Sequence, residues 1–311
     1  MADLILHHFD WSPFAEKARL ALGLKHACWR SVLVSMVPPR PNLEPLAGPY
    51  RKTPVLQIGA DIYCDTRMIA CELERRLPAP SLFPGGNQGL SLALSRFSDT
   101  SLFEPGAILS MTVNKEVPET VLADRRQLFT FIGPEHTAAA VPQLLSTLRA
   151  NGALLDSQLG DGRPFLLGTE AGWADLTCYF PLWMALTFFP MEAARLNLGP
   201  RLEAWLARVA AIGHGERAEI DAEAALTVAR EATPEPGRGV DADDPLGLQA
   251  GERVGVAPTD YGRAAVIGDL VTLDVSEVAV LRTHPRVGAV VTHFPRTGYR
   301  IDRERDLALA H

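Results

Sequence analysis

The chain has 311 residues, of which 47% are hydrophobic and 22% charged, so it is long enough for two domains and a large core. Its formal net charge of -7 argues against a protein whose main task is to hold nucleic acid or an anionic membrane. The four cysteines form no C-x-x-C pair and no zinc-ligand spacing, which favours reduced thiols in a cytoplasmic protein.

The N-terminus lacks the basic and apolar regions of a secretory signal. The most apolar run, residues 176–191, is interrupted by Pro181 and is shorter than the roughly 20 residues that a membrane span needs. We therefore expect a buried core helix there and no membrane partner.

The chain opens with a buried strand at Leu4-Ile5-Leu6, which gives way to the turn Trp11-Ser12-Pro13-Phe14 and an amphipathic helix. Ser12 takes the N-cap position and Pro13 the first helical position, while Gly23 predicts the end of the helix. Glu16, Lys17 and Arg19 lie opposite the apolar stripe and are expected on a polar face. Because a helix N-terminus carries partial positive charge, a thiolate beside Ser12 would be stabilised.

A second strand is predicted at residues 28–34, followed by an irregular, proline-rich connection over residues 38–49. Residues 53–58 and 62–64 then predict a β-hairpin, and Asp65-Thr66 opens a further helix. This order of elements indicates a thioredoxin-like α/β domain over residues 1–80.

Helical periodicity alone predicts an all-α domain over residues 88–232, in which Asp175 and Gly172 form a capping arrangement at the start of the apolar helix. Residues 233–247, rich in proline, glycine and carboxylates, predict a linker. Short β-branched runs at residues 253–257, 265–273, 278–281 and 287–294 then predict a small β-sheet or barrel module over residues 248–302.

Three linked features of residues 1–232 resemble the cytosolic glutathione transferase superfamily. Ser12-Pro13-Phe14 is similar to the serine-type, tau-like active-site turn of that family. Lys52-Thr53-Pro54-Val55-Leu56 resembles its cis-proline loop, and Asp65-Thr66, eleven residues beyond Pro54, resembles its pair of an acidic and a hydroxyl residue.

The resemblance implies glutathione as co-substrate, no metal, and a homodimer in which Glu16, Asp99 or Arg96 faces the partner subunit. Ser12 would donate a hydrogen bond to the thiol sulfur, and Phe14 would lie within the glutathione site. Thr53, beside Pro54, would pair with the peptide backbone as an added strand. Thr66 would bind the γ-glutamyl carboxylate, Asp65 the ammonium, and Lys52 the opposite carboxylate.

Each of these residues also has a purely structural interpretation. Ser12 and Thr66 are ordinary helix caps, Asp65 complements a helix dipole, and an exposed lysine such as Lys52 is usually solvated. Trp11 and Phe103 are candidates for an apolar substrate pocket, although aromatic residues at helical spacing usually belong to a core.

The six arginines of residues 282–305 form a local basic segment that indicates either a docking surface for an acidic partner or a solvated strand face; nucleic acid is an unlikely partner. Three functions follow from the sequence. The first is a transferase that conjugates glutathione to a small apolar electrophile. The second is a noncatalytic glutathione-binding or scaffold protein whose C-terminal module docks a partner. The third is a glutathione-dependent isomerase or dehalogenase.

Overall fold

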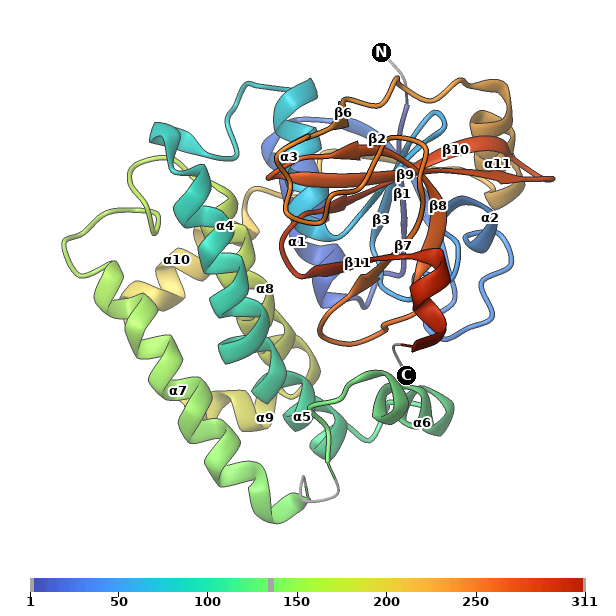
Figure 1. Cartoon of the computed structure of the whole chain (residues 1–311). Helices are drawn as coiled ribbons and strands as arrows, with labels where there is room; N and C mark the ends of the chain where they lie inside the picture. Colours follow the sequence, from blue (N-terminus) through green and yellow to red (C-terminus); the bar gives the residue numbers. More distant parts are fainter. Residues whose placement is uncertain (1–2, 134–136, 310–311) are drawn as a thin grey trace. The chain divides into compact units, whose positions relative to one another are not determined.

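The computed structural model of the chain describes residues 3–133 and 137–309, which divide into two compact units (Figure 1). The first unit contains residues 3–12, 28–72 and 217–309, and the second contains residues 13–27 and 73–216. A thioredoxin-like N-terminal domain, a helical domain and additional C-terminal strands are all present, as the sequence predicts.

The described strands lie in the first unit, apart from Glu216 at the start of β5, and join into one sheet of the order β11-β7-β8-β9-β10-β4-β3-β1-β2-β5, with β6 paired to β8. Their bounds are β1 (Leu4–His8), β2 (Cys28–Leu33), β3 (Val55–Ile58), β4 (Asp61–Cys64), β5 (Glu216–Glu219), β6 (Gly239–Val240), β7 (Arg253–Pro258), β8 (Val266–Leu273), β9 (Glu277–His284), β10 (Gly288–Pro295) and β11 (Tyr299–Arg303).

The N-terminal strands follow the thioredoxin-like pattern. β1 runs parallel to β2 and antiparallel to β3, and β3 forms the predicted hairpin with β4. The helices of this unit are α2 (Glu44–Ala47), the first part of α3 (Thr66–Arg76), and α11 (Ala222–Glu231). Helix α2 interrupts the stretch that the sequence predicts to be irregular. Ala225 of α11 packs against Ile5 and Val32, so α11 helps to cover β1 and β2.

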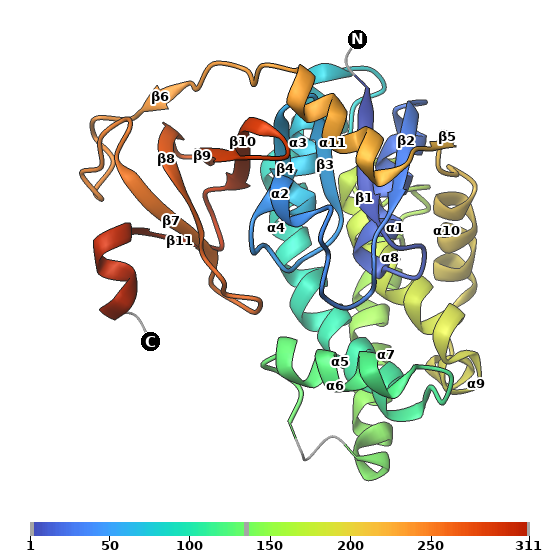
Figure 2. The same ribbon diagram turned by 90° about the vertical axis from the view of Figure 1, so that its right-hand side faces the viewer.

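The C-terminal strands are continuous with the N-terminal sheet, which the sequence does not predict. β7 to β10 form an antiparallel series that contains the four predicted runs, and β11 returns to pair with β7. β10 then pairs in parallel with β4, from Val291 opposite Asp61 to His293 opposite Tyr63 (Figure 2). The added segment is therefore an extension of the thioredoxin-like sheet rather than a separate sheet.

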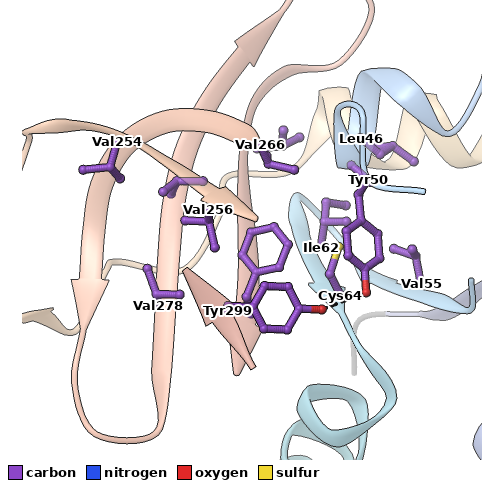
Figure 3. Close-up of a cluster of buried hydrophobic side chains, with 14 of the residues drawn as sticks. Leu46, Tyr50, Val55, Ile62, Cys64, Val254, Val256, Val266, Val278 and Tyr299 are labelled. Carbon is purple, nitrogen blue, oxygen red and sulfur yellow. Dashed lines mark hydrogen bonds between the residues drawn. The ribbon is translucent and has the colours of Figure 1, made fainter. Parts of the chain in front are cut away.

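One hydrophobic core serves both halves of this sheet (Figure 3). Leu46, Tyr50 and Ile62 of the N-terminal part lie in the same buried cluster as Val278 and Phe294 of the C-terminal strands. Fully burying a side chain of this size contributes about 1.5 to 3 kcal/mol. The two parts consequently depend on each other for much of their apolar burial.

The second unit is helical. Its helices are α1 (Pro13–Leu24), the end of α3, α4 (Gln88–Phe97), α5 (Phe103–Val113), α6 (Glu119–Leu128), α7 (Val141–Gln158), α8 (Trp173–Phe188), α9 (Pro190–Ala193) and α10 (Pro200–Ala210). Five short helical turns complete the described chain: Pro84–Gly86, Ser98–Leu102, Ala138–Ala140, Ala194–Leu196 and Glu304–Leu309. Across residues 3–133 and 137–309, no helix combines the length and the apolar character needed to cross a membrane.

The polar face predicted for α1 is buried, so that expectation is wrong. Lys17 is fully buried, with its ammonium 3.0 Å from Asp99 Oδ1 and 4.7 Å from the centre of the Phe180 ring. Glu16 is 5% exposed and binds Arg19 and His214. Contacts within one chain thus occupy Glu16 and Asp99, which the sequence assigns to a subunit interface.

Helix α1 ends one residue after Gly23, close to the stop that the sequence predicts there. The helix continues to Leu24, and His26 adopts the left-handed conformation, with φ of 49°, that ends it. A Cβ at Gly23 would lie 2.0 Å from the carbonyl oxygen of Gly213. Gly23 is therefore required for close packing of α1 against the backbone of residues 213 and 214.

The capping arrangement at α8 is confirmed. Oδ2 of Asp175 accepts the Gly172 N–H at 3.0 Å, and Oδ1 accepts the Leu166 N–H and the Trp205 indole N–H at 2.8 Å each. Burial raises the pKa of Asp175 even though these donors favour its ionised form. A Cβ at Gly172 would lie 2.7 Å from Pro84 Cδ, which explains why glycine occupies this cap.

Candidate functional site

Three segments of the first unit meet at one end of the sheet. His7 of β1 is the Cα partner of Val55 in β3, and Val55 is in turn the partner of Cys64 in β4. From this point, β1 continues toward Ser12, β3 is preceded by Thr53-Pro54, and β4 is followed by Asp65-Thr66. The strand register therefore brings three separate segments of the chain to the same end of the sheet.

The turn at Ser12 connects this end of the sheet to α1. The Ser12 N–H donates to the Phe9 carbonyl at 3.1 Å, and the residue is 3% exposed. Trp11 beside it is 62% exposed. The turn thus presents one large apolar side chain to solvent and holds the serine directly before the first residue of the helix.

The peptide bond between Thr53 and Pro54 is cis, as the sequence predicts. Thr53 lies outside the paired part of β3, and the backbone hydrogen bonds found across residues 3–133 and 137–309 include none to its N–H or C=O. Since buried backbone groups normally find partners, this segment offers an extended edge to which a peptide can bind.

Thr66 is the first residue of α3 and is 5% exposed. Asp65 before it has a positive φ of 77°, a conformation that aspartate tolerates better than most residues. In the described hydrogen bonds, neither the Thr66 amide nor its hydroxyl donates to another residue. A helix N-terminus with available donors is suited to a carboxylate.

The Asp65 carboxylate already has partners within the chain. Arg67 donates to it from Nε at 3.2 Å, from Nη2 at 3.1 Å and from its backbone N–H at 2.9 Å. Burial acts to raise the pKa of Asp65, but the guanidinium of Arg67 and the ammonium of Lys52 outweigh burial and hold the pKa well below its usual range. Asp65 is thus ionised, and the positive charges of Arg67 and Lys52 balance its negative charge.

Two tyrosines of the buried core, Tyr50 and Tyr299, lie close to each other (Figure 3). The Tyr299 hydroxyl donates to Asp65 Oδ2 at 3.2 Å, and the hydroxyls of Tyr50 and Tyr299 are 3.0 Å apart. Burial raises the pKa of both tyrosines well above the usual value, so both remain neutral. Tyr299 belongs to β11, and the sequence reasoning did not include it in the site.

Lys52 is also held by the C-terminal part of the chain. Its ammonium lies 2.6 Å from Oδ1 and 2.8 Å from Oδ2 of Asp260, and 4.2 Å from the centre of the Tyr261 ring. The prediction that Lys52 is solvated or holds only a ligand did not anticipate this ion pair. No local sequence signal identifies Asp260, because it is 208 residues away and follows an ordinary β-strand.

Phe14 and Phe103 belong to the second unit, where they form an aromatic cluster. Their ring centres are 4.6 Å apart, and both rings approach Phe180, at 5.0 Å and 5.9 Å. Phe103 is 3% exposed. Core packing within this unit accounts for the contacts of Phe103.

Arginines of the predicted basic segment, residues 282–305, form ion pairs with carboxylates of the same chain. Arg286 binds Glu223 at 2.6 Å, Arg303 binds Glu252 at 2.6 Å, and Arg300 binds Asp302 at 2.5 Å. Arg282 donates to the Leu46 carbonyl at 2.9 Å. These arginines therefore tie the C-terminal strands together and to α2 and α11.

Comparisons with known proteins identify the family of the chain. The family model described as the N-terminal domain of glutathione S-transferase matches residues 6–81, and the model of the C-terminal domain matches residues 138–208. A GST-like protein of known structure from Pseudomonas syringae is 36% identical, with a TM-score of 0.77, over 97% of this chain and 100% of that one. This match is long enough to include the C-terminal strands.

More distant structures share the fold. Poplar glutathione transferase F1 is 12% identical, with a TM-score of 0.53, over 68% of this chain and 93% of its own. A glutathione S-transferase domain-containing protein from Marinobacter aquaeolei is 19% identical, with the same TM-score, over 67% of this chain and 97% of its own. Among curated proteins, none matches the chain. The two family models and the Pseudomonas syringae relative together show that the chain belongs to the glutathione S-transferase superfamily.

Proposed function

We propose that the protein is a serine-type, tau-like glutathione transferase that conjugates the thiol of a glutathione-type peptide to a small apolar electrophile. The main support for this proposal is that the segments of Ser12, Thr53 and Thr66 lie at the same end of the sheet. These residues offer three kinds of group that a thiol tripeptide needs: a hydroxyl donor, a backbone edge and a helix N-terminus.

The peptide binds in an extended form. Thr53 pairs its backbone with the cysteinyl residue, and Thr66 receives the γ-glutamyl carboxylate through its amide and hydroxyl. The ammonium group lies near Asp65, which is ionised and shares its charge with Arg67. The glycine end lies near Lys52.

Ser12 acts on the sulfur. Its hydroxyl donates a hydrogen bond to the thiolate and lowers the pKa of the bound thiol, whose free value is about 8.5. The thiol proton passes to solvent, the sulfur electron pair forms a bond to the electrophilic carbon, and the leaving group departs with the electron pair of its own bond. The exposed ring of Trp11 contacts the apolar electrophile in this proposal, and the active form is a cytoplasmic homodimer.

A second candidate is a noncatalytic glutathione-binding or scaffold protein. The internal partners of Lys52 and Asp65 leave less charge for a ligand at both ends of the site, which would weaken glutathione binding in either candidate. An isomerase or dehalogenase would use the same activated thiol and differs only in the electrophile.

Calorimetric titration of the full chain with glutathione, combined with a panel of electrophiles, tests these proposals. The transferase proposal predicts saturable binding and conjugation that falls at least about tenfold in Ser12→Ala. Binding without turnover would favour the scaffold, whereas an absence of binding would refute every glutathione-dependent function considered for the chain. Turnover that is unchanged in Ser12→Ala would refute the role of the serine.

A further inference from the structure

The loop after β7 holds the charge of Lys52 in a fixed geometry. Both carboxylate oxygens of Asp260 lie within 2.8 Å of the ammonium, and the Tyr261 ring covers another side of it at 4.2 Å. The Tyr261 N–H donates to Asp260 Oδ1 at 2.7 Å, and Arg263 Nε donates to the Asp260 carbonyl at 2.9 Å. The loop therefore fixes Asp260 through its own contacts as well as through Lys52.

The same loop is tied to the segment that reaches Asp65. The Thr259 N–H donates to the Gly298 carbonyl at 3.0 Å, and Tyr299, the next residue, donates to Asp65. Thr297 accepts hydrogen bonds from Arg67 at 3.2 Å and 3.1 Å. The C-terminal strands thus contribute to both charged ends of the candidate site, and Lys52 directly precedes the Thr53 edge.

The ion pair changes what Lys52 can recognise. A lone ammonium attracts a carboxylate, but a carboxylate that approaches Lys52 here is also repelled by the negative charge of Asp260, which lies 2.6 Å from the ammonium. A primary carboxamide presents both a carbonyl acceptor and N–H donors. It can accept from Lys52 while it donates to Asp260, so its hydrogen-bonding pattern matches the pair.

We propose that Asp260 is a specificity-determining residue, through which the site selects thiol peptides whose C-terminal end is an amide over those that end in a free carboxylate. This inference rests on the proposed function, because it assumes that a γ-glutamyl-cysteinyl thiol peptide lies along Thr53. It adds the chemical class of the thiol substrate and assigns a binding role to the C-terminal strands.

Titration calorimetry with two probes tests the inference: glutathione, and glutathione whose glycine carboxylate is replaced by a carboxamide. The native chain is expected to bind the amide at least as tightly as glutathione. Asp260→Asn removes the opposing charge, so its preference should shift by about tenfold toward glutathione. Asp269→Asn is the matched control, because the Asp269 carboxylate also forms an ion pair, with Arg253, and has no described contact with Lys52.

The possible outcomes separate the two proposals. If the native chain prefers glutathione over the amide as strongly as Asp260→Asn does, the specificity inference is wrong while the glutathione function stands. If neither probe binds to the native chain or to a folded Asp260→Asn variant, both proposals are wrong. Thermal unfolding of each variant establishes that it is folded. A shift that also appears in Asp269→Asn would show that general charge, rather than the Lys52 pair, sets the preference.

Discussion

His293 of β10 and Asp61 of β4 are joined across the parallel strand pair that links the C-terminal strands to the thioredoxin-like sheet. Nε2 of His293 lies 3.0 Å from Asp61 Oδ1, and Nδ1 lies 2.7 Å from Glu277 Oε1. Tyr63 stacks on the imidazole at 4.4 Å, and Arg238 binds Glu277 at 2.5 Å. An imidazolium that donates to two carboxylates therefore holds β4, β9 and β10 together.

The His293 contacts predict a pH-dependent stability. Burial lowers the pKa of His293, but the hydrogen bonds and charges of Asp61 and Glu277 outweigh burial, and the pKa is raised. The folded chain consequently binds the proton more tightly than the unfolded chain. This contribution is fully present below the unfolded pKa of about 6.5 and is lost as the pH rises through the higher folded pKa.

We expect His293→Gln to lower the free energy of unfolding by about 3 kcal/mol near pH 6, because the buried carboxylate of Asp61 loses its described cation and, of its described cations, Glu277 keeps only Arg238. The difference from the native chain should shrink as the pH rises to about 9. Urea unfolding across this range measures it, with His284→Gln as the control, since the described bond of His284 is with the Arg286 amide. A difference that does not vary with pH would contradict the protonated His293.

The shared core predicts that the C-terminal strands are required for folding of the N-terminal sheet. Phe294 is fully buried among side chains from both parts, so Phe294→Ala should cost about 3 to 5 kcal/mol. Val275 is 87% exposed, and Val275→Ala should change stability by less than about 0.5 kcal/mol. Denaturant unfolding compares the two variants. A chain cut after Asp244 that retains a cooperative unfolding transition in the thioredoxin-like sheet would argue for separate folding instead.

Replacing either of two glycines in the helical unit by alanine should change the stability of the protein, and the two changes should have opposite signs. At Gly23, the new Cβ would overlap the Gly213 carbonyl, so Gly23→Ala should destabilise the protein by about 2 kcal/mol or more. At Gly89 in α4 a Cβ meets nothing within 4 Å, and Gly89→Ala should stabilise by about 0.5 kcal/mol. Thermal unfolding of both variants measures these changes. An equal shift in melting temperature at the two positions would contradict the close packing of α1 at Gly23.

At the N-cap of α8, the intrinsic N-cap preference favours serine, whereas the packing around Gly172 favours glycine. Serine is a better N-cap residue than glycine by a few tenths of a kcal/mol. Because a Cβ at Gly172 would lie 3.0 Å from the Leu82 carbonyl as well as against Pro84, we expect Gly172→Ser to lower the melting temperature. A higher melting temperature for Gly172→Ser would mean that Pro84 and Leu82 can move without cost.

Local patterns explain which parts of the structure could be predicted from the sequence. The apolar run at Leu4-Ile5-Leu6, the hairpin after Pro54 and the helical stripes of α7 and α10 depend on residues close together in the chain. The Asp175 cap was likewise predicted, since its partners begin three residues away. The structure also brings the segments of Ser12, Thr53 and Thr66, which the sequence proposes as parts of a site, to one end of the sheet.

The unpredicted features depend on contacts between distant segments. Lys17 resembles a surface residue in an amphipathic pattern, but Asp99 and aromatic rings bury it. The β10 to β4 pairing and the Lys52 to Asp260 ion pair join residues more than 200 positions apart. Strand β5 is exposed along its whole length, so it shows no alternation of apolar and polar residues. Local periodicity contains none of this information.

The central claim is that Ser12 stabilises the thiolate of a bound glutathione-type peptide. The most direct test is a pH titration of the thiolate absorbance of bound glutathione, in the native chain and in Ser12→Ala. Our account predicts that the bound thiol has a pKa at least about one unit lower in the native chain, a difference of about 1.4 kcal/mol in favour of the thiolate. Equal thiol pKa values in the two proteins, at full occupancy of both, would contradict it.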